Sequence, residues 1–349
     1  MPTIPSPTQT TRNQIFKMYE DQADRTRRPH LGASVIGHEC DRHLWLHFRW
    51  AKQEQMEGRI LRLLDTGKRQ EQRLIDDLRA CGVEVFAPEE QQTFAAVGGH
   101  FGGSMDAAAL GLVEAPKTWH VLEFKTASAF SFKKIAKEGV ERAKPQHYAQ
   151  MQMYMGWAGL DRAMYIVVNK DNDDIYTERV EFLRDTFDAL LKRANDVITA
   201  EEPPAVPFSG PDSPACKWCH FSPMCYGTEA PDVNCRTCVH STPELDGNAR
   251  WSCREHGRDL DEAEQNAGCY KHLHMPQLIA NFAALKHAGD EIVIYTNVLA
   301  PEREIHQPIH TSHDITNCND KTTLGWDYSE HERAAITFEQ FLEAKTAEL

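Results

Sequence analysis

Three features are missing from this chain of 349 residues, and each absence narrows what it can be. No apolar run approaches the roughly 20 residues that a membrane-spanning helix needs. The first residues, MPTIPSPTQT, are polar and Pro-rich and lack the apolar segment of a secretory signal peptide. The P-loop pattern G-x-x-x-x-G-K-(S/T) is also absent. We therefore expect a soluble cytoplasmic protein, with any ATP-driven motor on a separate chain.

An excess of basic residues is missing as well. The formal net charge is −14, which argues against indiscriminate binding to nucleic acid. The charge is uneven, because residues 1–80 contain 14 Lys and Arg against 11 Asp and Glu. The stretches RTRRPH and TGKRQEQR in this part are candidates for a local basic groove.

The order of apolar patterns predicts an α/β fold. A flexible arm is expected over residues 1–30, followed by a helix with Ser34 as its N-cap and by a longer helix that ends at Gly82. Strands are expected within 83–88, 92–111, 119–126, 163–170 and 175–182, with helices from Pro145 and over 184–200. After Pro203 the composition changes to Pro, Gly and Cys. The tail then predicts a helix at 276–288, a strand at 291–299 and a last helix at 337–347.

Two carboxylates and a lysine stand out among the predicted strands. In WHVLEFKTAS, Glu123 and Lys125 are two residues apart, so on a strand both point to the same face. An ion pair on a half-buried strand is the simpler interpretation. Asp106, in GGSMDAAAL, is costly to bury unless it is paired or binds a cation. If the strands are neighbours, these residues converge, and two carboxylates attract Mg²⁺ or Mn²⁺. Such a metal activates water against a phosphate, while the ammonium stabilises the developing charge.

A helical pair completes the pattern, since Gln150 and Tyr154 are four residues apart and share one helix face. The order G-x-x-D, E-x-K and Q-x-x-x-Y resembles the PD-(D/E)xK nucleases, in particular their RecB-like branch. The resemblance implies a restriction-endonuclease-like core, a central mixed sheet flanked by helices, over residues 31–230. It also implies that Asp106, Glu123, Lys125, Gln150 and Tyr154 form the catalytic site, with Glu71 as a further metal ligand on the preceding helix.

Ten cysteines are present, and without a secretory signal their clustering indicates metal rather than disulfides. The pattern C-x2-C-x5-C comprises Cys216, Cys219 and Cys225. Together with the distant Cys40 it resembles the iron–sulfur nucleases, in which a [4Fe–4S] cluster joins the two ends of the nuclease domain. A zinc knuckle completed by His220 is the alternative.

A second set consists of Cys235, Cys238, Cys253 and Cys269. A C-x2-C pair followed by two single cysteines fits tetrahedral Zn²⁺, and a metal would explain how a short, polar segment folds. His240, His256 and His272 are alternatives for one thiolate, and free structural cysteines are the alternative without metal. We therefore expect a zinc module at 231–275 and a small α/β extension at 276–349.

These patterns lead to one functional expectation. The chain is expected to be an Mg²⁺- or Mn²⁺-dependent deoxyribonuclease, an exonuclease acting on single-stranded or duplex DNA ends in recombination or repair. The resemblance implies a bacterial or phage-infected host cell, and a recombinase or single-strand-binding protein as partner. The alternatives are an endonuclease of the same fold and a catalytically silent, nuclease-like scaffold that binds DNA or protein.

Overall fold

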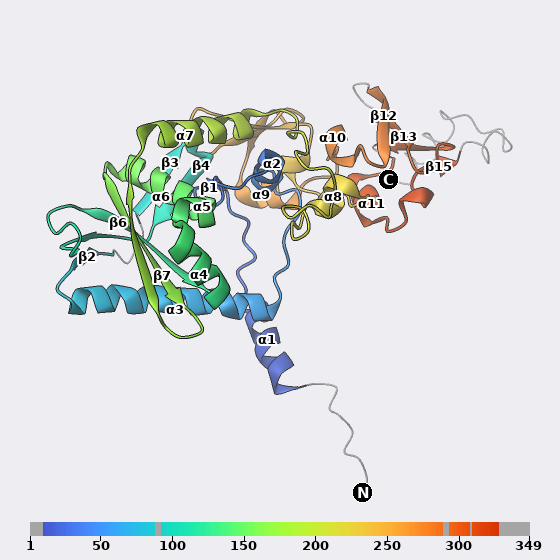
Figure 1. Cartoon of the computed structure of the whole chain (residues 1–349). Coiled ribbons are helices and arrows are strands. Elements are labelled where there is room, and N and C mark those ends of the chain that lie inside the picture. Colours follow the sequence, from blue (N-terminus) through green and yellow to red (C-terminus); the bar gives the residue numbers. More distant parts are fainter. Residues whose placement is uncertain (1–9, 88–91, 289–292, 308, 328–349) are drawn as a thin grey trace, which may run out of the picture. The chain divides into compact units, whose positions relative to one another are not determined.

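The computed structural model describes residues 10–87, 92–288, 293–307 and 309–327. The chain divides into two compact units, which are described separately (Figure 1). The first unit comprises Met1–Leu44, Glu54–Thr199 and Leu245–Ala249. The second comprises Trp45–Gln53, Ala200–Glu244 and Arg250–Leu349.

The first unit contains a central mixed sheet, as the sequence predicted. Its elements are α1 (Thr11–Asp21), β1 (Leu31–Gly32), the start of α2 (Asp41–Phe48), α3 (Gly58–Ala80), β2 (Glu84–Phe86), β3 (Gln92–Ala96), η1 (Val97–Gly99), β4 (Phe101–Met105), β5 (Ala107–Leu110), β6 (His120–Ala127), α4 (Ala129–Glu138), α5 (Val140–Ala143), α6 (Pro145–Ala158), β7 (Arg162–Asn169), β8 (Ile175–Glu181) and α7 (Arg184–Thr199).

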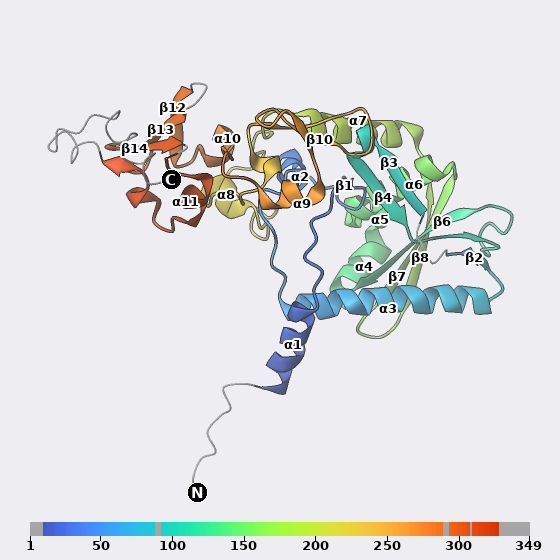
Figure 2. The same cartoon turned by 180° about the vertical axis from the view of Figure 1, so that it is seen from behind.

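The larger sheet has the strand order β2-β5-β6-β7-β8. Strands β6 and β7 are parallel, and the other neighbouring strands are antiparallel. A smaller sheet has the order β1-β4-β3. In it β1 pairs parallel with β4, although 68 residues lie between Gly32 and Phe101 in the sequence. Both sheets and their helices can be followed in Figures 1 and 2.

Helices cover both faces of the larger sheet. Helix α3 packs Leu74 and Ile75 onto Leu122 and Phe124 of β6, within a core that also holds side chains of β5 and β7. Figure 1 shows α3 along one side of the sheet and α5 and α6 along the other. Successive residues of a strand point to opposite faces. Leu122 and Phe124 point toward α3, so Glu123 and Lys125 of the same strand point to the side of α6. The sheet thus separates an apolar face from the face that carries the charged pair.

The start and end of α6 follow the expected local chemistry. Pro145 occupies the first turn, where its missing N–H costs nothing, and Gly159 ends the helix in the left-handed conformation with φ of 66°. Met151, Met153 and Met155 are all fully buried. The sequence therefore located this helix correctly, and its methionines form core packing.

Two predictions for the N-terminal part differ from the structure. Within the expected flexible arm, residues 11–21 form α1, and Glu20 accepts a hydrogen bond at 2.7 Å from the backbone N–H of Gly58 at the start of α3. The negative charge of a carboxylate is stabilising at the N-terminus of a helix. Ser34 is not an N-cap, since α2 begins only at Asp41. The start of α1 also has a local signal, since the Thr10 side chain accepts a hydrogen bond from the backbone N–H of Asn13 at 3.2 Å.

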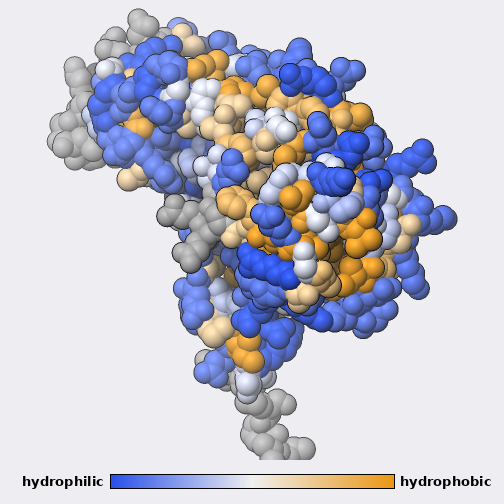
Figure 3. All heavy atoms as spheres, turned by 90° about the vertical axis from the view of Figure 1, so that its left-hand side faces the viewer, coloured by the Kyte–Doolittle hydropathy of each residue, from blue (hydrophilic) through white to orange (hydrophobic). Residues whose placement is uncertain are grey.

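The surface of the chain is mixed in character. In the view of Figure 3 most residues are hydrophilic, and hydrophobic residues gather near the middle of the face that is shown. Within the described ranges, none of the helices combines the length and the apolar character that crossing a bilayer requires.

The second unit is built from short elements. They are α8 (Ser222–Tyr226), η2 (Cys235–Thr237), β9 (Ser241–Pro243), β10 (Trp251–Cys253), β11 (Arg258–Leu260), α9 (Glu262–Ala267), α10 (Pro276–Ile279), β12 (Ala283–Ala288), β13 (Val293–Asn297), β14 (Arg303–Gln307), α11 (Ser312–Asn317), η3 (Lys321–Thr323) and β15 (Trp326–Asp327). The sheets have the orders β11-β10-β9 and β12-β13-β14-β15.

The helix predicted at 276–288 is wrong beyond its first turn. Residues 276–279 form α10, but residues 283–288 form β12, which pairs antiparallel with β13. The segment AALKHA has a good helix propensity, yet cross-strand pairing overrides so weak a preference. The strand predicted at 291–299 corresponds to β13, and the helix predicted at 337–347 lies outside the described residues.

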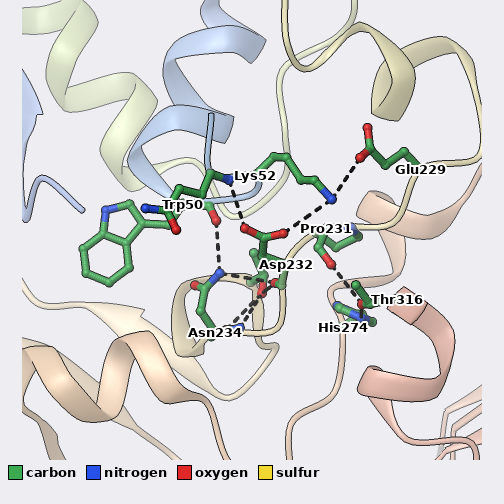
Figure 4. A network of polar contacts seen from close by, with 10 residues as sticks. Trp50, Lys52, Glu229, Pro231, Asp232, Asn234, His274 and Thr316 are labelled. Atoms are coloured by element: carbon green, nitrogen blue, oxygen red, sulfur yellow. Dashed lines mark hydrogen bonds and ion pairs between the residues drawn. The ribbon is translucent and has the colours of Figure 1, made fainter. Parts of the chain in front are cut away.

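A polar network holds residues 50–53 within the second unit (Figure 4). Asn234 donates to the backbone oxygen of Trp50 at 3.0 Å, and Asp232 accepts from the backbone N–H of Gln53 at 2.9 Å. Lys52 forms an ion pair with Glu229 at 2.9 Å. These contacts explain why a segment so early in the chain belongs to a unit built mainly from residues after 200.

Candidate active site

Strand pairing brings Asp106 next to Glu123. Strands β5 and β6 are antiparallel with Ala107 opposite Leu122, so the preceding residue, Asp106, lies opposite Glu123. On the same face of β6, the ammonium of Lys125 contacts Glu123 Oε1. The convergence that the sequence predicted for these three side chains is therefore present in the fold.

Glu123 is the most deeply buried member of this group. Its side chain is 0% exposed, and its Oε2 accepts no hydrogen bond from the described residues. Burial, offset in part by Lys125 and reinforced by Asp106 and Glu71, raises the pKa of Glu123 to about 7. A buried carboxylate oxygen without a donor is costly unless a cation lies beside it.

Helix α3 contributes a third carboxylate, Glu71, which is half-buried. Burial raises the pKa of Glu71, and the carboxylate of Asp106 raises it further, whereas Lys125 and Lys68 oppose the shift. Glu71 therefore lies near enough to Asp106 and Lys125 for their charges to act on its carboxyl. Asp106 and Glu71 likewise act on Glu123, so the three carboxylates influence one another, with the ammonium of Lys125 opposing them.

Lys125 remains charged in this setting. Burial lowers the pKa of its ammonium, but the adjacent Glu123 carboxylate, together with Asp106 and Glu71, outweighs burial and produces a net upward shift. Its side chain stays 28% exposed, so the ammonium can still meet a substrate.

Gln150 and Tyr154 reach the site from α6, and both are buried. Burial and the negative charge of Glu123 raise the pKa of Tyr154, while a hydrogen bond with Gln150 opposes that shift. The phenol is therefore neutral and able to donate a hydrogen bond. A Cβ atom at Gly103 would lie 2.8 Å from the Tyr154 hydroxyl, so the glycine of G-x-x-D permits β4 to approach this ring.

Two further residues near the site were missed by sequence reasoning. His147, on α6, and Tyr165, on β7 opposite Glu123, are hydrogen-bonded at 2.7 Å between Nδ1 and the hydroxyl. Burial, with Lys125 and Lys144 nearby, lowers the pKa of His147 to about 3, so its ring is neutral. The spacing of His147, Gln150 and Tyr154 along one helix face was a usable signal, but Tyr165 requires knowledge of strand pairing.

The two basic stretches noted in the sequence each place one cation near this site. The positive charge of Arg28 acts on Tyr154, and that of Lys68 acts on Glu71. Arg28 is exposed and approaches the hydroxyl of Ser34 at 3.4 Å. Two positive charges therefore act on residues of the candidate site in addition to that of Lys125.

The donor set fits a hard divalent cation, because it offers carboxylate oxygens from three elements, one of them buried without a donor. Within the described part of the chain, no group of three or more His, Cys, Asp or Glu side chains is placed so that it could hold a metal ion. One oxygen of Glu123 contacts the ammonium of Lys125.

The second set of cysteines lies together in the second unit. Cys235, Cys238, Cys253 and Cys269 line one cavity of about 240 Å³ between η2, the small sheet and α9. Burial and the three neighbouring thiols raise the pKa of Cys235 to about 12. The Cys235 thiol donates to the backbone oxygen of Glu264 at 3.4 Å. The spacing in the sequence thus corresponds to a common cavity.

Three histidines line the same cavity, and one of them is hydrogen-bonded to neighbouring groups. His272 Nε2 is hydrogen-bonded to the backbone oxygen of Asn234 at 2.9 Å and to the Thr237 hydroxyl at 3.2 Å. His240 and His256 also line the cavity, and the Nδ1 atom of His240 has no hydrogen-bond partner among the described residues. The cavity therefore offers four thiols and also the histidines that the sequence indicated as alternatives for one of them.

The first cysteine set is divided between the units. Cys216, Cys219 and Cys225 lie in one short turn-rich segment of the second unit, where Cys219 N–H donates to the Cys216 backbone oxygen at 3.1 Å. Cys40 belongs to the first unit, and its sulfur accepts from the backbone N–H of His43 at 3.4 Å. The four-cysteine cluster stays a prediction from the sequence.

Comparison with known proteins gives distant likenesses only. No family model matches the chain, and no curated protein is significantly similar to it. Among solved structures, it is similar to an alkaline exonuclease, LHK-Exo, from Laribacter hongkongensis, with 15% identity and a TM-score of 0.37 over 52% of this chain and 90% of the other. The complex of LHK-Exo with dAMP gives 16% and 0.35 over 53% and 89%. The protein SSO0001 gives 16% and 0.39 over 62% and 96%. These identities and TM-scores are too low to carry over a function, so a function has to be inferred from the side chains of this chain.

Proposed function

We propose that this chain is a metal-dependent deoxyribonuclease of the PD-(D/E)xK type that acts as an exonuclease on DNA ends. The observation that carries the proposal is the buried Oε2 of Glu123, which has no donor among the described residues and lies in a site shared with Asp106, Glu71 and Lys125. A surface ion pair between Glu123 and Lys125 explains neither the complete burial of Glu123 nor the two other carboxylates.

Glu123 and Asp106 would hold Mg²⁺ or Mn²⁺, with Glu71 as a further ligand from α3. When bound, the cation supplies Lewis-acid activation of the phosphodiester. It would also offset the repulsion among the three carboxylates, which adds to the effect of burial in raising the pKa of both Glu71 and Glu123.

The other residues act by position and charge. The ammonium of Lys125 stabilises negative charge that develops on the phosphate and orients the attacking water. The neutral phenol of Tyr154 donates a hydrogen bond, and Gln150 orients that phenol. His147 and Tyr165 form a hydrogen-bonded pair beside Glu123 and fix the floor of the site.

Two alternatives make different predictions. An endonuclease of this fold would cut circular DNA, which an exonuclease leaves intact. A silent scaffold would bind without cutting, but such a protein has no need to bring Asp106, Glu123 and Lys125 together. A recombinase or single-strand-binding partner and the cytoplasm of a bacterial or phage-infected cell stay predictions from the resemblance.

The test is an assay with end-labelled single- and double-stranded DNA, a circular control, and Mg²⁺ or Mn²⁺. We expect digestion from the ends, its abolition in Asp106→Ala and Glu123→Ala, and a loss on the order of 10²-fold or more in Lys125→Ala, with DNA binding retained. The matched control is Lys192→Ala, an exposed lysine on α7, which should cut at the wild-type rate. A wild-type rate in Lys125→Ala would contradict the assignment.

We also propose that the chain carries two structural metal centres. Cys235, Cys238, Cys253 and Cys269 would hold Zn²⁺, which is supported by the cavity that they share. Cys40, Cys216, Cys219 and Cys225 would hold a [4Fe–4S] cluster, which is supported by their spacing alone.

A further inference from the structure

Helix α4 directly follows the strand that carries Glu123 and Lys125. It begins after the N-cap Ser128 and packs Phe132 and Ile135 inward. Phe132 meets Tyr176 of β8 edge-on, with 6.5 Å between the ring centroids. This packing fixes the helix about its axis and determines which side chains point to solvent.

The outward face of α4 combines one aromatic ring with three lysines. Phe130, Lys133, Lys134 and Lys137 stand at i, i+3, i+4 and i+7, so they share one side of the helix. All three lysines are exposed, and the Phe130 side chain is 84% exposed. Lysines alone would be an ordinary solvated helix face. A single exposed phenyl ring is also common on protein surfaces. The combination of the ring with three lysines on one helix face is what matches a partner with both negative charge and flat apolar groups.

The charges of this face are only weakly neutralised. Lys134 is 3.9 Å from Glu138, the upper limit for an ion pair, and within the described residues Lys133 and Lys137 form none. The chain as a whole carries a formal charge of −14. A helix face with three cations therefore runs against the charge of the molecule, which favours a polyanion as the partner.

The position of this face matches a path into the proposed active site. Phe130 follows Lys125 by five residues, so their Cα atoms are at most about 18 Å apart. This is the rise of about five stacked nucleotides. Helix α4 packs on β6 and β7 through the face of the sheet that also carries Glu123 and Lys125, since Tyr176, the partner of Phe132, pairs with Val167 in the same row as Lys125.

We infer that the outward face of α4 binds single-stranded DNA on its way to the carboxylate site. Lys133 and Lys137 contact successive phosphates, and Phe130 stacks on an unpaired base, an arrangement typical of single-strand binding. This inference rests on the proposed nuclease function and specifies its substrate as a single strand. Duplex DNA offers phosphates but no free base face for Phe130.

Binding is measured separately from cleavage. The probe is an end-labelled oligothymidylate, followed by fluorescence anisotropy with the full-length Glu123→Gln protein, which should not cut it. In that background we expect Phe130→Ala to weaken binding roughly tenfold, the loss of one stacked base. Lys133→Gln with Lys137→Gln should reduce the slope of log K against log salt concentration by about 1.4, or about 0.7 for each lost phosphate contact.

The control variants are Val113→Ala, another exposed apolar residue of the first unit, and Lys192→Gln on α7. Both should bind like the parent protein, and all variants should retain its melting temperature. Binding constants and salt slopes equal to these controls would overturn the inference, and so would an effect of Phe130→Ala confined to duplex DNA or RNA. Failure of the nuclease proposal is a separate result, namely weakened binding in these variants without any cleavage by the wild-type protein.

Discussion

At the scale of single residues, Glu123 has the most unusual surroundings of the candidate site. Its side chain is completely buried, it contacts Lys125 through one oxygen, and its other oxygen has no donor among the described residues. Burying this second carboxylate oxygen without a donor or a metal ion lowers the stability of the fold. The loss of stability should be measurable when the protein is free of metal.

The pH dependence of stability measures that cost. The pKa of Glu123 is about 7 in the folded chain, mainly through burial, against an ordinary 4.5. Because the folded value is the higher one, the contribution of this carboxyl to stability is fully present below about 4.5 and is lost as the pH rises through about 7. With EDTA present, we therefore expect the melting temperature of the wild-type protein, minus that of Glu123→Gln, to decrease as the pH is raised from 5 to 8.

Addition of Mn²⁺ at pH 8 should raise the melting temperature of the wild-type protein more than that of Glu123→Gln, since the variant lacks one of the three proposed anionic ligands. Thermal unfolding followed by circular dichroism gives both values. A difference between the two proteins that stays constant with pH would mean that Glu123 ionises normally and that the site does not strain it.

At the scale of elements, the site depends on the close approach of β4 to α6. Gly103 makes this approach possible, because a Cβ atom there would lie 2.8 Å from the hydroxyl and 3.1 Å from Cε1 of Tyr154. Tyr154 is only 3% exposed, so its ring has little room to move aside.

Gly103→Ala should therefore displace Tyr154 and lower the cleavage rate about tenfold or more, since small displacements at a reacting centre are costly. Tyr154→Phe should also be slower, but adding Gly103→Ala should cost less in this variant than in the wild type, because the shortest contact, the one with the hydroxyl, is then absent. Gly67→Ala is the control, since a Cβ atom there meets nothing within 4 Å. Full activity in Gly103→Ala would show that the ring can adapt.

Much of the element order was predictable from the sequence, for a physical reason. Strands β5 to β8 and helices α6 and α7 are marked by periodicity and by end signals such as Pro145, which act locally. What local patterns could not supply was pairing. Three features depend on strand pairs that are distant in the sequence. They are the strand β12 in place of a predicted helix, the parallel pairing of β1 with β4, and the position of Tyr165 opposite Glu123.

The proximity of the candidate residues was predictable to the same degree. Asp106, Glu123 and Lys125 were predicted from residue type and spacing to converge, and the register of β5 and β6 brings them together. His147 carried a helical signal that was not used. Phe130 carried none, because an exposed aromatic residue on a helix cannot be distinguished from a buried one before the packing of Phe132 is known.

At the scale of the whole molecule, the chain divides into two compact units, one built mainly from residues before 200 and one mainly from residues after it. The segment Trp45–Gln53 belongs to the second unit, where Arg236 stacks on Trp50 at 3.5 Å from the ring centroid. Arg236 also donates to the backbone oxygen of Phe48 at 3.1 Å and to Gln265 at 3.0 Å. A buried, always charged guanidinium with these partners joins the early segment to the cysteine-rich part.

The metal content of the purified chain tests this organisation. Protein prepared without oxygen should be brown and contain about four irons per chain and about one zinc. Cys253→Ser should lose the zinc and lower the stability of the second unit, because a structural metal contributes folding energy directly. It should keep the iron and the brown colour, since Cys253 belongs only to the cavity shared with Cys235.

Cys40→Ser should have the opposite effect, with loss of the iron and its colour and retention of the zinc. A cluster that links Cys40 to Cys216 would close a loop of more than 170 residues, so its loss should also lower the melting temperature. Cys81→Ser is the matched control, because Cys81 is exposed at the end of α3 and belongs to neither set. If Cys40→Ser kept its iron, the link between the two parts of the chain would be wrong. The three later cysteines would then have a different fourth ligand, and His220, directly after Cys219, is the first residue to substitute.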